Sequence, residues 1–138
     1  MHATVRLKED DSLEGLTQSG HSVVMDRSPD AGGKNLGARP MEMMLLSLGG
    51  CTLIDVILIL RKSRQNFSDI RIEIDAERAD EIPQVFTKIH LHFVVIAADI
   101  DASRVERAIN LSAEKYCSAS RMLESIAEIT HDFEILSG

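Results

Sequence analysis

The stretch from Arg39 to Leu60, "RPMEMMLLSLGGCTLIDVILIL", constrains the fold more than any other part of the chain. Pro40 suits the first position of a helix, Glu42 suits the first turn, and the following "RKSR" places positive charge where the helix dipole favours it. Apolar residues occupy every face between these signals, so we expect a long helix that is buried on all sides. Glu42, Asp55, two glycines and a serine interrupt the apolar run, which favours a core helix over a membrane span.

Short alternating segments surround this helix. Alternation predicts strands at residues 2–8, 13–17, 22–26, 70–77, 85–97 and 128–136. A capping box at Ser103 and Glu106 predicts a second helix to about Tyr116, and residues 118–127 allow one or two further turns. Residues 27–38 form a long loop with three glycines. The order βββ-α-ββ-α-α-β predicts a single α+β domain over residues 1–138, with a mostly antiparallel sheet.

The chain is too small to cover its central helix alone. One sheet covers one side of the helix, and 138 residues with one other long helix leave little for the opposite side. We therefore expect a homodimer in which central helices or sheets bury one another. The net charge of −7 argues against nucleic acid and against an anionic membrane as partners. The first residues contain no apolar signal-type run, so we expect a reducing, cytoplasmic environment without structural disulfides.

One of the two cysteines, Cys51, lies in the middle of the central helix, directly after Gly49 and Gly50. A lone cysteine in an apolar helix commonly behaves as a small hydrophobe, and apolar burial disfavours its thiolate. Each glycine in a helix interior costs about 1 kcal/mol relative to alanine, so two together need a reason. Either another helix approaches closely here, or the glycines leave room beside the thiol for a substrate or a second sulfur.

The segment "GARPMEMMLLSLGGC" resembles the motif of the OsmC/Ohr family, in which a proline opens a long apolar helix carrying a cysteine after small residues. The segment "AEKYCSAS" around Cys117 resembles the later cysteine site of that family, and the separation of 66 residues suits it. The form "GGCTLIDV" is most similar to the YhfA-like members. The resemblance implies an OsmC-like fold, an intertwined homodimer with two active sites at the subunit interface, and thiol-dependent reduction of hydroperoxides.

The resemblance also assigns a role to each cysteine. Cys51 falls on the peroxidatic position and Cys117 on the resolving one. A Cys51 thiolate would become a sulfenic acid, Cys117 would condense with it to a disulfide, and an external dithiol would restore both thiols. No further cofactor is implied. The apolar surroundings of the thiol suit an organic hydroperoxide better than a small polar one.

Two positions depart from the family pattern. Met41 stands where well-studied members carry a glutamate that holds an arginine near the thiolate, and Ser118 stands where they carry a proline. Glu42 follows Met41, but the nine residues from Glu42 to Cys51 turn an ideal helix by about 180°. We therefore expect Glu42 to point away from Cys51 and to face the unpaired N–H groups of the first turn.

The sequence offers two arginines as candidates for the cation that would activate the thiol. Arg27 and Arg39 lie in or beside the glycine-containing loop before the helix, and either could reach Cys51 of the same or the partner subunit. A solvated loop arginine is the commoner fate of such residues. Asp55, one turn after Cys51, could hold such an arginine in place or pair with a charge in the core; alone it would oppose the thiolate.

His90 and His92 raise the question of a metal. The two imidazoles share one face of a predicted strand, an arrangement that zinc could use. Lys88 shares that face, and no cysteine or carboxylate pattern in the sequence completes a site. We therefore predict that no metal is bound.

Two functions of different classes remain open. The first is a two-cysteine hydroperoxide reductase. The second is a non-enzymatic protein, either a module that holds an apolar small molecule or a stress-associated protein, in which the thiols are merely buried. The distance between the two sulfurs in the folded protein separates these interpretations, because direct disulfide formation requires Cβ atoms about 3.5–4.5 Å apart.

Overall fold

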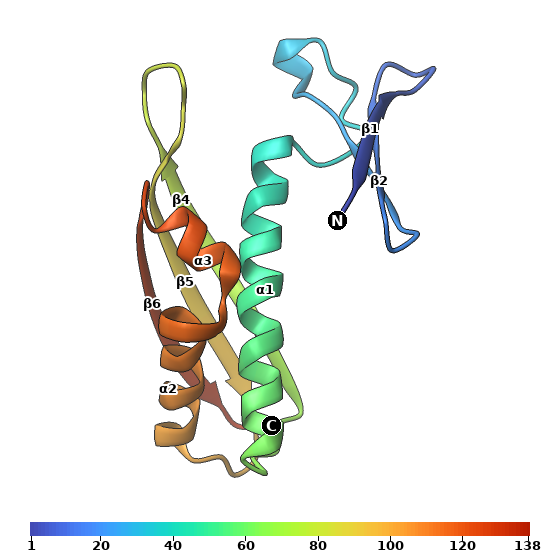
Figure 1. Cartoon of the computed structure of the whole chain (residues 1–138). Helices are drawn as coiled ribbons and strands as arrows, with labels where there is room; N and C mark the ends of the chain where they lie inside the picture. The colour runs from blue at the N-terminus through green and yellow to red at the C-terminus, as the bar shows by residue number, and fades with distance from the viewer. The chain divides into compact units, whose positions relative to one another are not determined.

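The structure is a computed structural model and describes all 138 residues. It contains two compact units, Met1–Leu46 and Ser47–Gly138, which are described separately. The predicted element order is confirmed, as is the α+β class (Figure 1). The elements are β1 (Ala3–Leu7), β2 (Leu13–Thr17), β3 (Ser22–Met25), a 3₁₀ turn (Pro29–Ala31), α1 (Pro40–Lys62), β4 (Asp69–Arg78), β5 (Phe86–Ile96), α2 (Ala102–Leu111), a π-helical turn (Ser112–Tyr116), α3 (Ser118–Leu123) and β6 (Glu128–Leu136).

The first unit contains a three-stranded antiparallel sheet in the order β1-β2-β3. The sequence predicts a half-buried β1 with Val5 and Leu7 facing inward, and this prediction is wrong for the single chain. Val5 is 59% exposed and Leu7 is 67% exposed, because no helix layer of this unit covers that face. The β1 surface therefore carries apolar side chains without a partner.

The loop after β3 is organised around one buried carboxylate, that of Asp26, which is 3% exposed. Its oxygens accept backbone N–H groups from Arg27 at 2.8 Å, Lys34 at 3.0 Å and Leu36 at 3.1 Å. The Lys34 N–H, followed by that of Leu36, lowers the pKa of Asp26. A Cβ at Gly33 would lie 1.8 Å from a backbone oxygen, so this glycine allows a close chain approach. The loop is therefore held by a carboxylate at its own start.

The second unit contains the sheet β4-β5-β6 with α1, α2 and α3 on one face (Figure 1). β4 pairs antiparallel with β5, and β5 pairs parallel with β6 after the helical crossover. A mostly antiparallel arrangement is confirmed, although it is divided between two sheets. Fully buried side chains of β5, α1 and α2 form the core of this unit: Phe93, Val94, Val95, Leu48, Val56, Leu60, Val105 and Ala108.

The two glycines of α1 have different environments. A Cβ on the buried Gly49 would lie 2.7 Å from Ile74 Cδ1 and 3.4 Å from Ile72 Cγ2 of β4. A Cβ on the exposed Gly50 would meet nothing within 4 Å. Gly49 therefore allows α1 to approach a strand closely. The sequence suggested two other reasons for the glycines, a neighbouring helix or space beside the thiol. Within the single chain, no packing contact explains Gly50.

One side of α1 remains uncovered in the single chain, contrary to the expectation of burial on all sides. The uncovered stripe is Leu46 (62% exposed), Ile54 (59%) and Leu58 (59%), with the exposed Gly50 at the same four-residue spacing. By length and composition α1 could cross a membrane, since an 18-residue window has a mean hydropathy of 2.3. Core helices of soluble proteins share these properties.

Two local predictions are wrong. Asp101, and not Ser103, caps α2, because the Asp101 carboxylate accepts the Ser103 backbone N–H at 2.9 Å and the Ser103 hydroxyl at 2.7 Å. Alternation over residues 85–97 predicts Val85 on the same inner face as Ile89, Leu91 and Phe93, but Val85 is 40% exposed, and Phe86 takes the inner position at 5%. A bulge in β5 causes this exchange. Glu77 pairs with Lys88 and Arg78 pairs with Phe86, so β5 has one extra residue between these two pairs.

Candidate functional site

The fold brings the two cysteines together within the second unit. Cys51 is half-buried in the middle of α1, and Cys117 lies at the junction between the π-helical turn and α3, where it is 3% exposed. Both are free thiols, and each lies close enough to shift the pKa of the other. The two cysteines, separated by 66 positions in the sequence, therefore lie near each other in a single chain.

Hydroxyl and amide groups surround this pair of sulfurs. Thr52 is buried, and its Oγ1 donates to the Leu48 carbonyl at 2.9 Å and lies 3.3 Å from Cys117 Sγ. The backbone N–H of Ser120 donates to Cys117 Sγ at 3.3 Å. The backbone N–H groups of Ala119 and Ser118 lower the pKa of Cys51. A hydroxyl with one hydrogen cannot fully serve two acceptors, so Thr52 would turn from Leu48 to Cys117 when that sulfur is ionised.

The surroundings move the two thiol pKa values in opposite directions. Burial raises the pKa of Cys117, but hydrogen bonds from Ser120 and Thr52 outweigh burial, and the net pKa is lowered. The Ala119 N–H lowers the pKa of Cys51, but burial and the hydrogen bond to Cys117 outweigh it, and the net pKa is raised. The pair therefore loses its first proton as a unit, with the charge favoured on Cys117 and a proton shared from Cys51.

Asp55 has a hydroxyl partner in place of the cation considered from the sequence. The hydroxyl of the fully buried Ser112 donates to Asp55 Oδ2 at 2.9 Å and lies 3.5 Å from the Thr52 carbonyl. No arginine or lysine forms an ion pair with Asp55. Asp55 therefore joins α1 to the π-helical turn that leads to Cys117, and so supports the position of that cysteine.

The arginines proposed as activating cations are both bound to their own loop in the first unit. Arg27 donates to the Ala31 carbonyl at 3.0 Å and to the Asp11 carboxylate. Arg39 Nη1 donates to Asn35 Oδ1 at 2.9 Å. Within Ser47–Gly138 no lysine or arginine binds either sulfur. A role for either arginine at the thiols stays a prediction.

Glu42 occupies the position that the helix argument predicted for it. Its Oε1 accepts the backbone N–H of Arg39 at 2.8 Å, directly before the first residue of α1. The bond satisfies an N–H group at the start of the helix and places negative charge at the positive end of the dipole. The interpretation of Glu42 as a first-turn capping residue is confirmed.

Sequence reasoning missed three polar residues of the site: Thr52, Ser112 and Ser120. A signal for Thr52 was present, because it directly follows Cys51 and shares the otherwise apolar helix with Asp55 three positions later. Ser120 stands three residues after Cys117, a spacing at which a residue before a helix receives an N–H bond. Ser112 had no local signal, because its partners are about 60 positions away.

The parallel pairing of β5 and β6 places carboxylates beside the two histidines, which the sequence pattern did not reveal. Asp132 Oδ1 lies 2.8 Å from His90 Nε2 and 2.7 Å from His92 Nδ1, and Glu134 Oε1 lies 3.3 Å from His92 Nε2. Asp132, followed by Glu134, raises the pKa of His92. No three of these groups are arranged to hold one metal ion, so the cluster is an exposed ion-pair network on the sheet.

Comparison with known proteins agrees with this fold. Residues 32–132 match the family described as OsmC-like protein. Protein YhfA of Escherichia coli K12 is 43% identical over 137 residues, which cover 99% of both chains. A hypothetical protein from Aquifex aeolicus VF5 superposes with a TM-score of 0.86 at 27% identity, over 99% of this chain and 96% of that one.

A more distant structure shares the fold alone. An organic hydroperoxide resistance protein OsmC from Legionella pneumophila superposes with a TM-score of 0.71 at 11% identity, over 96% of this chain and 95% of that one. The family match covers most of the chain, and the bacterial relative covers nearly all of it. The chain therefore belongs to the OsmC-like family.

Proposed function

We propose that this protein reduces organic hydroperoxides with Cys51 and Cys117 as a redox pair. The observation that carries the proposal is the closeness of the two thiols, each of which shifts the pKa of the other, among amide and hydroxyl donors. A merely buried cysteine needs neither a second sulfur nor a donor set that lowers a thiol pKa. The fold shared with a protein named for organic hydroperoxide resistance adds support.

The first chemical step uses the accessible sulfur. Cys51 is the more exposed of the two, so it meets the peroxide, while its proton moves along the hydrogen bond to Cys117. The Cys51 sulfur attacks the terminal peroxide oxygen and the O–O bond breaks. The leaving alkoxide takes the proton held by Cys117, which yields an alcohol, a Cys51 sulfenic acid and a Cys117 thiolate.

The second step closes the disulfide. The Cys117 thiolate attacks the Cys51 sulfur, an S–S bond forms, the S–O bond breaks and hydroxide leaves. One hydroperoxide, one thiol and one thiolate thus give an alcohol, a disulfide and hydroxide. An external dithiol supplies the two electrons that restore the pair. A reducing cytoplasm would provide such a dithiol, and the proposed cycle uses no resident cofactor.

The proposal predicts a loss of both thiols on exposure to an alkyl hydroperoxide. Mixing the reduced protein with cumene hydroperoxide should remove two free thiols per chain and yield an intramolecular Cys51–Cys117 disulfide, read by thiol titration and by mass spectrometry of the linked peptides. The variant Cys51→Ser should retain its one thiol under the same conditions. Two unreactive thiols in the folded wild-type protein would overturn the proposal in favour of a non-enzymatic function.

We propose further that two copies of the chain pair through α1. The uncovered stripe of Leu46, Ile54 and Leu58 continues along one side of the helix, and Gly50 within it would permit a close approach of two backbones. Val5 and Leu7 of β1 offer further apolar surface. Soluble proteins rarely expose contiguous apolar area of this kind, and a second copy is the common way to cover it.

Pairing can be tested with a charge on this stripe. Ile54→Glu should convert a particle of twice the 15.3 kDa chain mass into a single chain in sedimentation equilibrium, because a carboxylate would be desolvated in the interface. Ile82→Glu is the matched control, since Ile82 is 93% exposed and lies in a loop away from α1. A wild-type protein that sediments as a single chain at micromolar concentration contradicts the proposal.

A further inference from the structure

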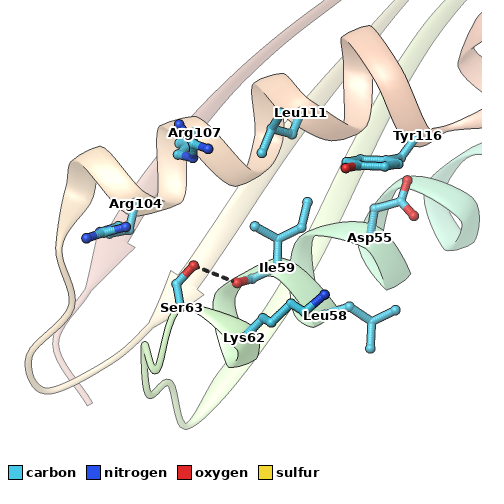
Figure 2. Close-up of a pocket in the computed structure, with 9 residues that line it drawn as sticks. All are labelled: Asp55, Leu58, Ile59, Lys62, Ser63, Arg104, Arg107, Leu111 and Tyr116. Carbon is cyan, nitrogen blue, oxygen red and sulfur yellow. Dashed lines mark hydrogen bonds between the residues drawn. The ribbon is translucent and has the colours of Figure 1, made fainter.

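A groove between α1 and α2 has no role in the thiol chemistry. Its volume is about 610 Å³, within the range of small-molecule sites, and all its lining residues belong to the second unit. Leu58 and Ile59 of α1, Leu111 of α2 and the ring of Tyr116 provide apolar surface (Figure 2). The spacing of the lining residues follows one face of each helix, so the two helices present matched walls.

One end of this groove is basic. Arg104 and Arg107 of α2 lie at this end, and the Lys62 side chain of α1 extends toward Leu58 (Figure 2). None of the three forms an ion pair with a carboxylate. Ser103 hydrogen bonds, and more weakly the attraction of Arg104, lower the pKa of Asp101, which is outside the groove. Three unpaired cations around one hollow are notable in a chain with a net charge of −7.

The opposite end of the groove contains Asp55 and Tyr116. The carboxylate of Asp55 already accepts the Ser112 hydroxyl, so it does not neutralise the basic end. Its negative charge would repel an anionic head group, whereas the three cations would attract it. The groove therefore has a direction, with an anion-attracting end and an apolar floor that leads toward Tyr116.

We propose that this groove binds an organic anion with an apolar body, with the head group at Arg104 and Arg107 and the hydrocarbon along Ile59 and Leu111. Carboxylate and phosphate head groups share the chemistry that arginine recognises, through paired N–H donors. The inference does not depend on the proposed peroxidase activity, because no step uses either sulfur. Binding can therefore be measured under reducing conditions without peroxide.

Decanoate is the first probe, titrated calorimetrically into the reduced wild-type protein. Arg104→Gln together with Arg107→Gln should weaken its binding about tenfold, since two charge-assisted contacts are lost. Arg61→Gln together with Arg64→Gln is the matched control. It removes the same charge near the end of α1, but neither residue lines the groove. Circular dichroism of both double variants verifies that they are folded.

The ligand series tests both halves of the proposed site. Decanol should bind at least about tenfold more weakly than decanoate, and acetate should not bind, because each lacks one half of the recognised structure. Tighter binding of decyl phosphate than of decanoate assigns a phosphate head group, and the reverse order assigns a carboxylate. Absence of decanoate binding, equal binding of decanol, or equal weakening in the two double variants overturns the inference.

Discussion

Replacing Cys117 with serine should stop turnover of hydroperoxide while lowering the pKa of Cys51. Turnover stops because no second sulfur remains to form the disulfide that the external dithiol reduces. The pKa of Cys51 falls because Cys117 is one of the influences that raise it, whereas the Ala119 N–H, which lowers that pKa, remains. The two expected effects together distinguish a coupled pair from two independent thiols.

The size of the second effect follows from thiolate chemistry. Each unit by which a thiol pKa falls toward the ambient pH raises the thiolate fraction about tenfold, but lower basicity reduces intrinsic nucleophilicity, so the net gain is about threefold. The measurement is the rate of iodoacetamide labelling of Cys51 against pH, in wild-type protein and in Cys117→Ser. The midpoint for Cys51 should move to lower pH in the variant.

A control separates this coupling from general disturbance of the site. Thr52→Val removes the hydroxyl that lies 3.3 Å from Cys117 Sγ, and Thr52→Ser retains it. Thr52→Val should raise the pKa at which the cysteine pair loses its first proton, because the hydroxyl stabilises the anion. Thr52→Ser keeps a hydroxyl and should leave that pKa as it is in the wild-type protein. If Cys51 in Cys117→Ser instead labels more slowly and at higher pH, Cys117 lowers the pKa of Cys51 and the proposed coupling is wrong.

The parts of the fold that the sequence predicted well are those with local causes. α1 begins at Pro40 and ends at Lys62 because a proline, a first-turn carboxylate and a basic C-terminal turn lie within a few residues of its ends. β6 extends over Glu128–Leu136, as alternation predicts. The pairing of Cys51 with Cys117 was predicted through family resemblance, since no local pattern connects positions 66 residues apart.

The parts that the sequence did not predict depend on contacts distant along the chain. The cap of α2 moved from Ser103 to Asp101 because two polar residues competed for the same N–H groups, a competition that propensity does not decide. The donors to Cys117 come from α1 and from the first turn of α3. The carboxylates beside His92 come from the parallel strand β6, about 40 positions away. Such neighbours are known only when the topology is known.

Gly49→Leu and Gly50→Leu should have very different consequences, although the two glycines are adjacent. A leucine at position 49 must displace Ile74 and Ile72 of β4, because even its Cβ would lie 2.7 Å from Ile74 Cδ1. Overpacking of this kind should lower the free energy of unfolding by about 3 kcal/mol or more. A leucine at position 50 points into open space in the single chain and should raise that free energy by about 0.5–1 kcal/mol through helix propensity.

Urea denaturation in the Ile54→Glu background measures these effects on the single chain, without a contribution from subunit association. In the protein that keeps Ile54, Gly50→Leu should weaken association. The leucine side chain would hold two facing helices apart at the stripe of Leu46, Ile54 and Leu58. Equal stability of the two leucine variants contradicts the contact of Gly49 with β4 as the reason for that glycine. Undiminished association of Gly50→Leu contradicts a close helix crossing at Gly50, since only such a crossing requires a residue without a side chain there.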